Sequence, residues 1–286
     1  MKRIEEGSRI LIVGLGLIGG SYADALSRQG YEVGAVDPDP EALAFARRQG
    51  WIRDGREDPD PEFLKQFSLV VLALYPHLVT EWVRTWQACL PQGALLTDVT
   101  GVKCPMIYEI QSLLREDLAF IGAHPMAGRE RSGVWNASAD IFQNANYIVT
   151  PTERNTPEET ETCRELGRIL GFSSISELSP EKHDEMVGFL SQLTHCIAIS
   201  LMTCRDSEHF TEYTGDSFRD LTRIARINDE MWSELFLLNR KELLRQMDLF
   251  SDQFHRLYLA IEQEDREGIR VIMRESTEQR KRFDKR

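Results

Sequence analysis

The chain has 286 residues, of which 42% are hydrophobic and 28% are charged, and its formal net charge is −12. This length predicts more than one domain, and the composition is that of a soluble globular protein. The acidic balance argues against anionic polymers and surfaces, so we expect no nucleic acid and no membrane as partners. An anionic substrate would therefore need a specific cationic side chain to hold it.

The five cysteines are an odd number and form no Cys-x-x-Cys pair. This pattern differs from a disulfide framework or a zinc site, so we expect no metal and a reducing, cytoplasmic location. The N-terminal apolar run is preceded by acidic as well as basic residues and contains a phosphate-binding motif, which argues against a signal peptide. We also expect no transmembrane segment.

Apolar, β-branched runs alternate with helical patterns from residue 9 to about 150. Such runs are typical of a parallel sheet covered by helices on both faces. The expected fold class is therefore α/β, with an N-terminal, Rossmann-like doubly wound sheet. The predicted strands are 9–13, 31–36, 69–74, 94–97, 118–121 and 147–149.

Segment 151–157 is typical of a linker. After it we expect a helix over about 157–170, a short strand over 173–177, and then almost only helix, including a long one from Pro180 to about Arg205. Apolar residues at helical spacing continue toward the C-terminus, and this stripe predicts a helical domain that packs against a second copy. An intramolecular bundle is the alternative. The stripe comprises Trp232, Leu235, Phe236, Leu243, Met247, Phe250, Phe254 and Tyr258.

The motif Gly14-Leu-Gly-Leu-Ile-Gly19 follows the first predicted strand and opens a helix. In such a motif the first glycine permits a tight turn, the second lets a pyrophosphate approach the backbone, and the third lets helix and strand pack closely. The helix N-terminus adds unpaired N–H groups and a positive dipole. A dinucleotide site is predicted, and the alternative is a glycine-rich turn without a ligand.

Asp37 ends the second predicted strand, 18 residues beyond Gly19. Its carboxylate can accept hydrogen bonds from ribose hydroxyls and would repel a 2′-phosphate, which favours NAD over NADP. The strictness of that choice stays open because Arg47 and Arg48 lie nearby in sequence. The expected cofactor-contacting residues are Gly14, Leu15, Gly16, Leu17, Ile18, Gly19, Asp37, Leu74 and Thr100.

A histidine rigidified by a proline follows the strand-like run 118–121. Imidazole is the usual proton acceptor near neutral pH, and open α/β sheets place their chemistry at strand ends. His124 is therefore the candidate base. The segment 97–103 ends the preceding strand and suits contact with cofactor and substrate, although Asp98 or Thr100 could simply cap a helix.

Two helical segments add polar groups. Asp184, Ser191 and His195 are spaced to share one face of the helix that begins at Pro180, which suggests a polar cleft. A histidine there could instead be a satisfied core residue. Farther along, Arg219 and Arg223 lie one helical turn apart, and either could clamp a carboxylate. The alternative for both arginines is pairing with Asp216 and Asp220.

Together these segments resemble the prephenate/arogenate dehydrogenase family of tyrosine biosynthesis, from about residue 8 to at least 240. The resemblance rests on motifs that occur in the family's order. They are the GxGxxG, Asp98-x-x-Gly-x-Lys103, the His-Pro-Met-Ala-Gly-x-Glu of 124–130, the Ser-Gln-Leu-Thr-His of 191–195, and the Phe-Arg-Asp-x-Thr-Arg-Ile-Ala of 218–225 with Trp232.

The resemblance implies an NAD-dependent oxidative decarboxylation of prephenate to 4-hydroxyphenylpyruvate by a homodimer. Residues 1–155 would bind NAD, and the all-helical residues 156–286 would bind substrate and dimerise. His124 would be the catalytic histidine, bonded to the C4 hydroxyl, and Arg223 would bind a substrate carboxylate. The substrate-binding residues implied are Arg223, His195, Thr100, Glu130, Asp184, Asp220 and Trp232.

One departure from the family concerns the support of His124. Many members carry a serine where this chain has Gly101, and that hydroxyl supports the catalytic histidine. Thr100 or a water is the candidate to replace it. Arogenate is the alternative substrate, and a non-catalytic NAD-binding sensor is a further alternative. A β-hydroxyacid dehydrogenase would need a lysine in the helical domain, where the long helix offers Lys182 only at its start.

Overall fold

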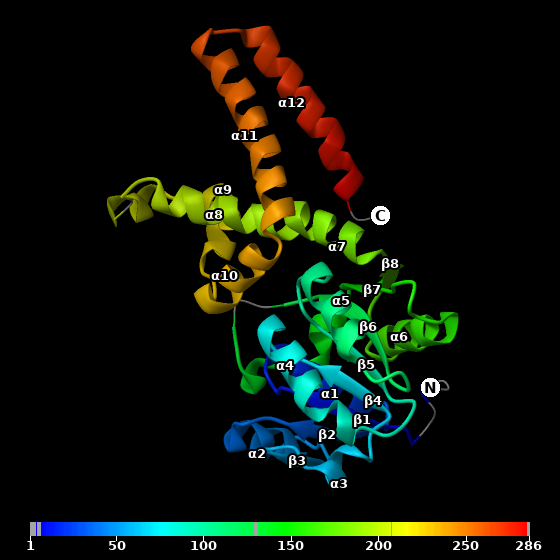
Figure 1. Cartoon of the computed structure of the whole chain (residues 1–286). Coiled ribbons are helices and arrows are strands. Elements are labelled where there is room, and N and C mark those ends of the chain that lie inside the picture. The colour runs from blue at the N-terminus through cyan, green and yellow to red at the C-terminus, as the bar shows by residue number, and fades with distance from the viewer. Residues whose placement is uncertain (1–3, 5–6, 129–130, 207, 285–286) are drawn as a thin grey trace. The chain divides into compact units, whose positions relative to one another are not determined.

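The computed structural model describes residues 4, 7–128, 131–206 and 208–284. The chain divides into two compact units, Met1–Asn239 and Arg240–Arg286, and each is described by itself. The first unit holds a β-sheet with helices on both faces, followed by further helices (Figure 1). The second unit is a helical hairpin.

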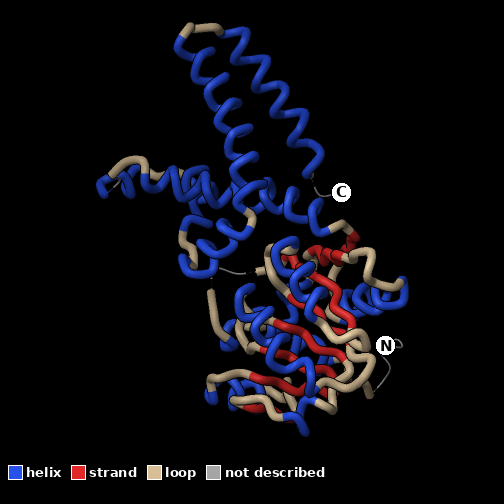
Figure 2. Tube along the Cα trace, viewed as in Figure 1, coloured by secondary structure: helices blue, strands red, loops and turns tan. Residues whose placement is uncertain are grey.

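The strands of the first unit form one eight-stranded sheet in the order β3-β2-β1-β4-β5-β6-β7-β8 (Figure 2). The strands predicted between residues 9 and 150 are all found, and so is the later one over 174–177. The short β3 was not predicted. The strands are β1 (Arg9–Val13), β2 (Glu32–Val36), β3 (Asp54–Arg56), β4 (Leu69–Leu72), β5 (Leu95–Asp98), β6 (Ala119–Met126), β7 (Asn146–Thr150) and β8 (Ser174–Glu177).

The expectation of an all-parallel sheet is wrong for β7 and also for β8, which pairs in parallel with β7. β7 runs antiparallel to β6, with His124 opposite Ile148. The described part of their connection contains two 3₁₀ turns, η2 (Val134–Asn136) and η3 (Ala139–Phe142). A parallel partner requires a crossover that returns the chain to the other end of the sheet, usually through an α-helix. The short turns do not provide that return, so the chain reverses direction.

Two apolar cores cover the two faces of the sheet, which confirms the doubly wound α/β architecture. Side chains of α1, α2 and α6 pack on one face, and side chains of α3, α4 and α5 pack on the other. These helices are α1 (Leu17–Arg28), α2 (Pro40–Arg48), α3 (Pro61–Leu64), α4 (Pro76–Trp86), α5 (Cys104–Leu113) and α6 (Pro157–Ile169). Because α6 and β8 also join this layer, the sheet extends past residue 155.

The long helix predicted from Pro180 is a continuous helical rod with a defect. It comprises α7 (Pro180–Val187), the π-helical turn η4 (Gly188–Leu193) and α8 (Thr194–Thr203). Hydrogen bonds in a π turn span one residue more than in an α turn, so positions on its two sides leave the simple α-helical register. The prediction that Asp184 and His195 share one face is therefore wrong.

The rod is also the one helix of the described residues that is long and apolar enough to cross a membrane, which the sequence reasoning missed. Its middle is nevertheless tied into the first unit by polar contacts. Nε2 of Gln192 donates to the carbonyl of Leu235, and Nδ2 of Asn239 donates to Oε1 of Gln192 at 2.8 Å. Such buried amide contacts are typical of a packed helix in a globular protein.

The remaining helices of the first unit are α9 (Asp216–Thr222), the 3₁₀ turn η6 (Arg223–Ala225) and α10 (Asp229–Leu238). Asn228 caps α10 by accepting a hydrogen bond from the N–H of Met231. The turn η6 contacts α8. This places the segment that carries Arg223 next to the helix that carries His195.

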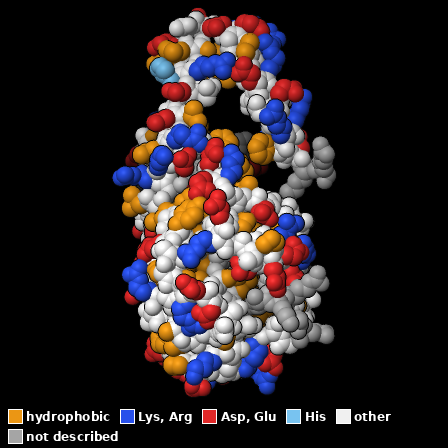
Figure 3. Space-filling view, turned by 45° about the vertical axis from the view of Figure 1, so that its right-hand side comes forward, with side chains coloured by type: hydrophobic (Ala, Val, Ile, Leu, Met, Phe, Trp, Pro, Cys, Tyr) orange, Lys and Arg blue, Asp and Glu red, His pale blue; other side chains and the backbone are white. Residues whose placement is uncertain are grey.

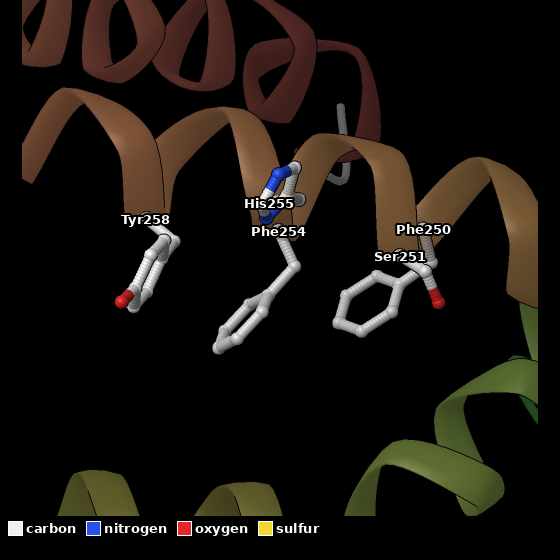
Figure 4. A pocket seen from close by; sticks show the side chains of 5 residues that line it. All are labelled: Phe250, Ser251, Phe254, His255 and Tyr258. Atoms are coloured by element: carbon white, nitrogen blue, oxygen red, sulfur yellow. The ribbon is translucent and has the colours of Figure 1, made fainter.

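The second unit consists of α11 (Arg240–Glu262) and α12 (Arg266–Arg280), joined by a tight turn that Asp265 caps. Arg256 and Glu275 form an ion pair between the two helices at 2.9 Å. The side chains of Phe250, Phe254 and Tyr258 project from one side of α11 (Figure 4). Phe254 is 64% exposed, so this aromatic part of the predicted stripe is not covered by its own chain.

Charged side chains of both signs share the surface. On the face drawn in Figure 3, Lys and Arg side chains are interspersed with Asp and Glu side chains, and hydrophobic side chains lie between them. Many of the ion pairs in the described residues are exposed i,i+3 or i,i+4 contacts on helices, such as Lys65 with Glu62 and Arg270 with Glu267. Pairs of this kind contribute about 0–1 kcal/mol each, so they do not hold the fold together.

Candidate functional site

The glycine-rich loop has the geometry that a dinucleotide needs. Gly14 has a φ of +93°, and a Cβ there would lie 2.5 Å from the carbonyl oxygen of Ala73. A Cβ on Gly19 would lie 1.9 Å from the carbonyl oxygen of Gly14. Gly16, in contrast, is exposed and faces open space. The first and third glycines are thus required by packing, whereas the second leaves room for a phosphate beside the N-terminus of α1.

Asp37 stands at the end of β2, beside this loop. Its carboxylate accepts hydrogen bonds from the backbone N–H of Leu15 and, at 2.8 Å, of Asp39. Each carboxylate oxygen has two acceptor positions, so the side chain can still accept from ribose hydroxyls. Leu17, Ile18 and Leu74 are partly exposed. These residues fit the adenosine and pyrophosphate portions of NAD.

A buried ion pair holds the loop after β5. Nζ of Lys103 lies 2.5 Å from Oδ2 of Asp98, and both side chains are fully buried. Oδ1 of Asp98 accepts the N–H of Ala123 at 3.1 Å. Burial lowers the pKa of Lys103, while the Asp98 charge opposes that shift. Because Ala123 directly precedes His124, the ion pair fixes this loop against the candidate base.

Thr100 does not take the place of the missing serine. Its buried hydroxyl donates to Oδ2 of Asp98 and accepts from Nζ of Lys103 at 3.2 Å. The hydroxyl therefore belongs to the ion-pair network inside the loop. The expectation that Thr100 supports the imidazole of His124 is wrong, because those bonds use the hydroxyl.

Gly101 lies next to His124, as its position in the motif predicts. A Cβ at Gly101 would be 4.0 Å from Cε1 of His124 and 3.5 Å from the methyl groups of Leu235. Both are ordinary van der Waals distances, and Gly101 is absent from the glycines with positive φ. Neither backbone nor space demands glycine here, so the loop could accept a small side chain beside the imidazole.

His124 is held by a second histidine, which the sequence reasoning missed. Nδ1 of His124 lies 2.9 Å from Nε2 of His183, and Nδ1 of His183 lies 2.8 Å from Oδ1 of Asp184. His183 is fully buried, whereas His124 keeps part of its surface exposed. The available signal was the His183-Asp184 dipeptide itself, since an acidic neighbour often orients an imidazole.

Burial lowers the pKa of His124 well below its usual value. The neighbouring charges of His183 and Lys103 lower it further, because a second positive charge nearby disfavours protonation. Burial also lowers the pKa of His183, although Asp184 opposes that shift. Both imidazoles are therefore neutral near pH 7, as a proton acceptor must be.

Asp184 links α7 to the N-terminus of α5. Its Oδ1 accepts the N–H of Lys103 at 2.9 Å, and its Oδ2 accepts the N–H of Cys104 at 2.8 Å. The cap residue of α5 offers no side-chain cap of its own, so this carboxylate supplies one from another helix. With His183 as a third donor, Asp184 is engaged by protein groups. This corrects its predicted role from substrate contact to support of the site.

His195 and Trp232 form a second cluster, on α8 and α10. The centroids of their rings lie 3.8 Å apart, and the ring centroid of Phe236 lies 5.6 Å from that of Trp232. Nδ1 of His195 donates to the carbonyl oxygen of Ser191 at 2.9 Å, which leaves its Nε2 as the remaining polar atom. Both rings are partly exposed. The cluster can therefore offer an aromatic wall and one hydrogen-bonding nitrogen to a ligand.

The remaining residues that the sequence predicted for the site, or weighed as alternatives, are exposed or lie outside the described residues. Arg219 forms an exposed ion pair with Asp216 at 3.1 Å, the alternative weighed above for both arginines. Asp220 is exposed on α9, and Arg223 is exposed on η6. Glu130 lies outside the described residues. Lys182 is exposed and pairs with Glu185, away from a buried catalytic position.

Two family models cover most of the chain. The nucleotide-binding domain of prephenate dehydrogenase matches residues 22–172, and its dimerization domain matches residues 179–275. The two matches leave residues 173–178 between them, and β8 lies in this interval. The chain is 30% identical to a prephenate dehydrogenase of Bacillus subtilis, over 91% of this chain and 72% of that protein.

Further relatives agree. A cyclohexadienyl dehydrogenase of Zymomonas mobilis is 26% identical over 95% of this chain and 94% of its own length. Among solved structures, a prephenate dehydrogenase of Aquifex aeolicus in complex with hydroxyphenyl propionate and NAD+ has a TM-score of 0.90 and 27% identity. That alignment covers 99% of this chain and all of the Aquifex chain (100%).

The contrast between Gly16 and Gly19 can be tested with a matched pair of alanine variants. Gly16→Ala should unfold at the wild-type temperature and bind NAD at least about tenfold more weakly, because its methyl group occupies the space left for the phosphates. Gly19→Ala should lose about 1–3 kcal/mol or more of folding free energy, because its Cβ overlaps the Gly14 carbonyl. Thermal unfolding and NAD titration would measure both. Unchanged NAD affinity in Gly16→Ala would contradict the assignment.

The lowered pKa values of the buried histidines predict an acid-sensitive fold. In the unfolded chain these rings take up protons near a pH of about 6.5, whereas in the folded chain they stay neutral to lower pH. The unfolded state then binds more protons, so stability should rise with pH. It should be complete above about pH 7 and fall progressively below about 6.5. Urea unfolding between pH 5 and 8 checks this, and His183→Gln should flatten the slope.

Proposed function

The chain belongs to the prephenate dehydrogenase family, and on that premise we propose that it oxidatively decarboxylates prephenate to 4-hydroxyphenylpyruvate with NAD. It is an NAD-dependent oxidoreductase. One observation carries the proposal of the reaction. It is the position of the His124 imidazole, which His183 holds at the carboxyl end of the sheet beside the Gly101 loop.

The proposed reaction uses His124 twice on the same oxygen. NAD supplies the hydride acceptor when bound. As hydride leaves C4 of the ring, His124 takes the proton of the C4 hydroxyl, and a carbonyl forms there. The ring carboxylate then departs as CO2, and its bonding electrons make the ring aromatic. His124 returns the proton to the resulting phenolate oxygen, which balances the reaction with no net proton change.

The substrate carries two carboxylates, and we assign the task of binding one of them to Arg223. A guanidinium makes paired hydrogen bonds to a carboxylate, and such a specific cation is needed in a chain of net charge −12. His195 offers a hydrogen-bonding nitrogen, and Trp232 offers an aromatic face next to it. Asp220 and Glu130 are assigned to the surroundings of the same pocket by their positions in the motifs.

Arogenate, which has an amino group in place of the side-chain keto group, is the second candidate substrate. The chain is similar to a probable arogenate/prephenate dehydrogenase of Methanocaldococcus jannaschii, at 23% identity over 75% of this chain. Both substrates carry the same hydroxyl group at C4 of the ring, and its oxidation is the same in each. The His124 mechanism therefore applies to either, and only the groups around the side chain distinguish them.

The protein is soluble and has a dimerisation domain, and we propose that it is a cytoplasmic homodimer. The exposed aromatic side of α11 supports a dimer, because contiguous exposed apolar surface marks association sites. We further propose a division of labour in which residues 1–155 bind NAD and residues 156–286 bind substrate and associate. The continuation of the sheet to Glu177 moves the structural boundary beyond that point.

The reaction is tested by following absorbance at 340 nm with NAD and either prephenate or arogenate. Prephenate should give the higher kcat/KM, and His124→Asn should lose about 10²–10⁴-fold in kcat because the base is gone. NAD affinity should stay unchanged in that variant. No NADH from either substrate would refute the proposed reaction, and wild-type turnover by His124→Asn would remove His124 from it.

The two arginines provide a matched test of substrate binding. Arg223→Ala should raise KM for prephenate by about 10- to 100-fold, because a hydrogen bond to a charged group is lost in ground and transition states alike. Arg219→Ala removes only an exposed ion pair and should change KM by less than about twofold. Steady-state kinetics measure both. Equal effects, or a larger effect of Arg219→Ala, would overturn the assignment.

The proposed dimer can be weakened at its aromatic surface. Phe254→Glu places a charge among Phe250 and Tyr258 on α11 and should shift the protein to a monomer at micromolar concentration. Gln279→Glu on the exposed face of α12 adds the same charge and should leave the dimer intact. Sedimentation velocity distinguishes the two states. A monomeric wild-type protein at these concentrations would contradict the proposal.

A further inference from the structure

We propose that His183 is a positioning residue that fixes the tautomer of His124 and leaves Nε2 of His124 as the atom that accepts the substrate proton. The inference rests on the function proposed above, in which His124 is the base. It also explains how a chain with Gly101 in place of a hydroxyl-bearing residue can orient its imidazole.

Three side chains, Asp184, His183 and His124, are joined by two hydrogen bonds, and the carboxylate of Asp184 sets the direction of both. The oxygens of Asp184 accept, so Nδ1 of His183, 2.8 Å from Oδ1, must carry a proton and donate it. A neutral imidazole has one donor nitrogen and one acceptor nitrogen. Nε2 of His183 is therefore an acceptor, and it points at His124.

The hydrogen bond between His183 and His124 then determines which nitrogen of His124 carries the proton. Nδ1 of His124 lies 2.9 Å from Nε2 of His183, so His124 donates from Nδ1. Its own Nε2 is then the unprotonated nitrogen. A base must present a free lone pair to the hydroxyl it deprotonates, and this tautomer does so. Had His183 been protonated on both nitrogens, its Nε2 would donate to Nδ1 of His124, and the proton of a neutral His124 would lie on Nε2 instead.

His183 is itself rigidly held, which makes it a suitable support. Its side chain is fully buried, and the carboxylate that orients it is bound by the N–H groups of Lys103 and Cys104. The backbone carbonyl of Asp184 also accepts from Asn239 at 2.9 Å. Asp184, which orients the ring of His183, is thus held by contacts to the start of α5 and to Asn239.

The tautomer can be measured directly in the unmodified protein. The chain has six histidines, and 15N-labelled histidine gives distinct nitrogen shifts for protonated and unprotonated ring positions. The His124 signals are identified by their absence from the His124→Asn spectrum. At pH 7.5 without substrate, we expect a protonated Nδ1 and an unprotonated Nε2 on His124. The opposite tautomer, or an averaged signal, would overturn the inference.

Two substitutions at His183 separate positioning from mere packing. The amide oxygen of His183→Gln can reach the place of Nε2 and accept from His124, whereas His183→Asn can replace only the Nδ1 contact to Asp184. The Asn variant should lose the fixed tautomer and at least about tenfold in kcat, with an unchanged KM for NAD. The Gln variant should keep the tautomer and lie within about fivefold of wild-type kcat.

A purely structural role predicts a different result. In that case both variants would lose similar stability and similar activity, and the His124 signals would not change between them. This outcome would overturn the inference. If the variants do not fold, the wild-type spectrum still decides the matter. The spectrum needs no substrate, so a wild-type protein with the expected tautomer but no activity on prephenate or arogenate would refute only the proposed function.

Discussion

The carboxylate of Asp184 is the point at which the nucleotide-binding sheet and the helical rod are joined around the candidate base. It accepts two N–H groups at the start of α5 and one from His183, and its residue's carbonyl accepts from Asn239. A helix N-terminus and a buried imidazole are thereby satisfied by one side chain. Removal of the Asp184 carboxylate would leave several buried donors unpaired. A substitution at Asp184 would therefore change the stability of the fold and the geometry of the site together.

The ion pair of Asp98 and Lys103 also helps to position His124, through the backbone of the preceding residue. Strand β5 ends at Asp98, whereas β6 continues to Met126, so the last part of β6 lacks a strand partner on that side. The Asp98 carboxylate accepts the N–H of Ala123 there in place of a strand carbonyl. A buried pair of charges is costly unless both partners are hydrogen-bonded, and here both are. The base is thus placed by polar contacts where regular sheet pairing stops.

The sequence predicted those features that depend on local patterns. The strands, the glycine loop and the long helix each have a period or a motif of their own, and the structure contains all of them. It did not predict the direction of β7, which depends on the connection from β6; the described part of that connection holds two 3₁₀ turns. It also missed His183, although the His183-Asp184 dipeptide was an available signal. Separately, the π turn between Asp184 and His195 breaks the α-helical register from which a shared face was inferred. Thr100 was a reasonable support for His124 by proximity in sequence, yet its hydroxyl turns toward Asp98 and Lys103.

The space beside Gly101 bears on how such a site can change over evolutionary time. A side chain there would meet only ordinary contacts from Leu235 and His124, and the backbone does not require glycine. An imidazole with two independent holders can lose one of them by a single substitution and still be oriented by the other. Exchange of serine and glycine at this position would then be close to neutral, and lineages could drift between the two forms without passing through an inactive enzyme.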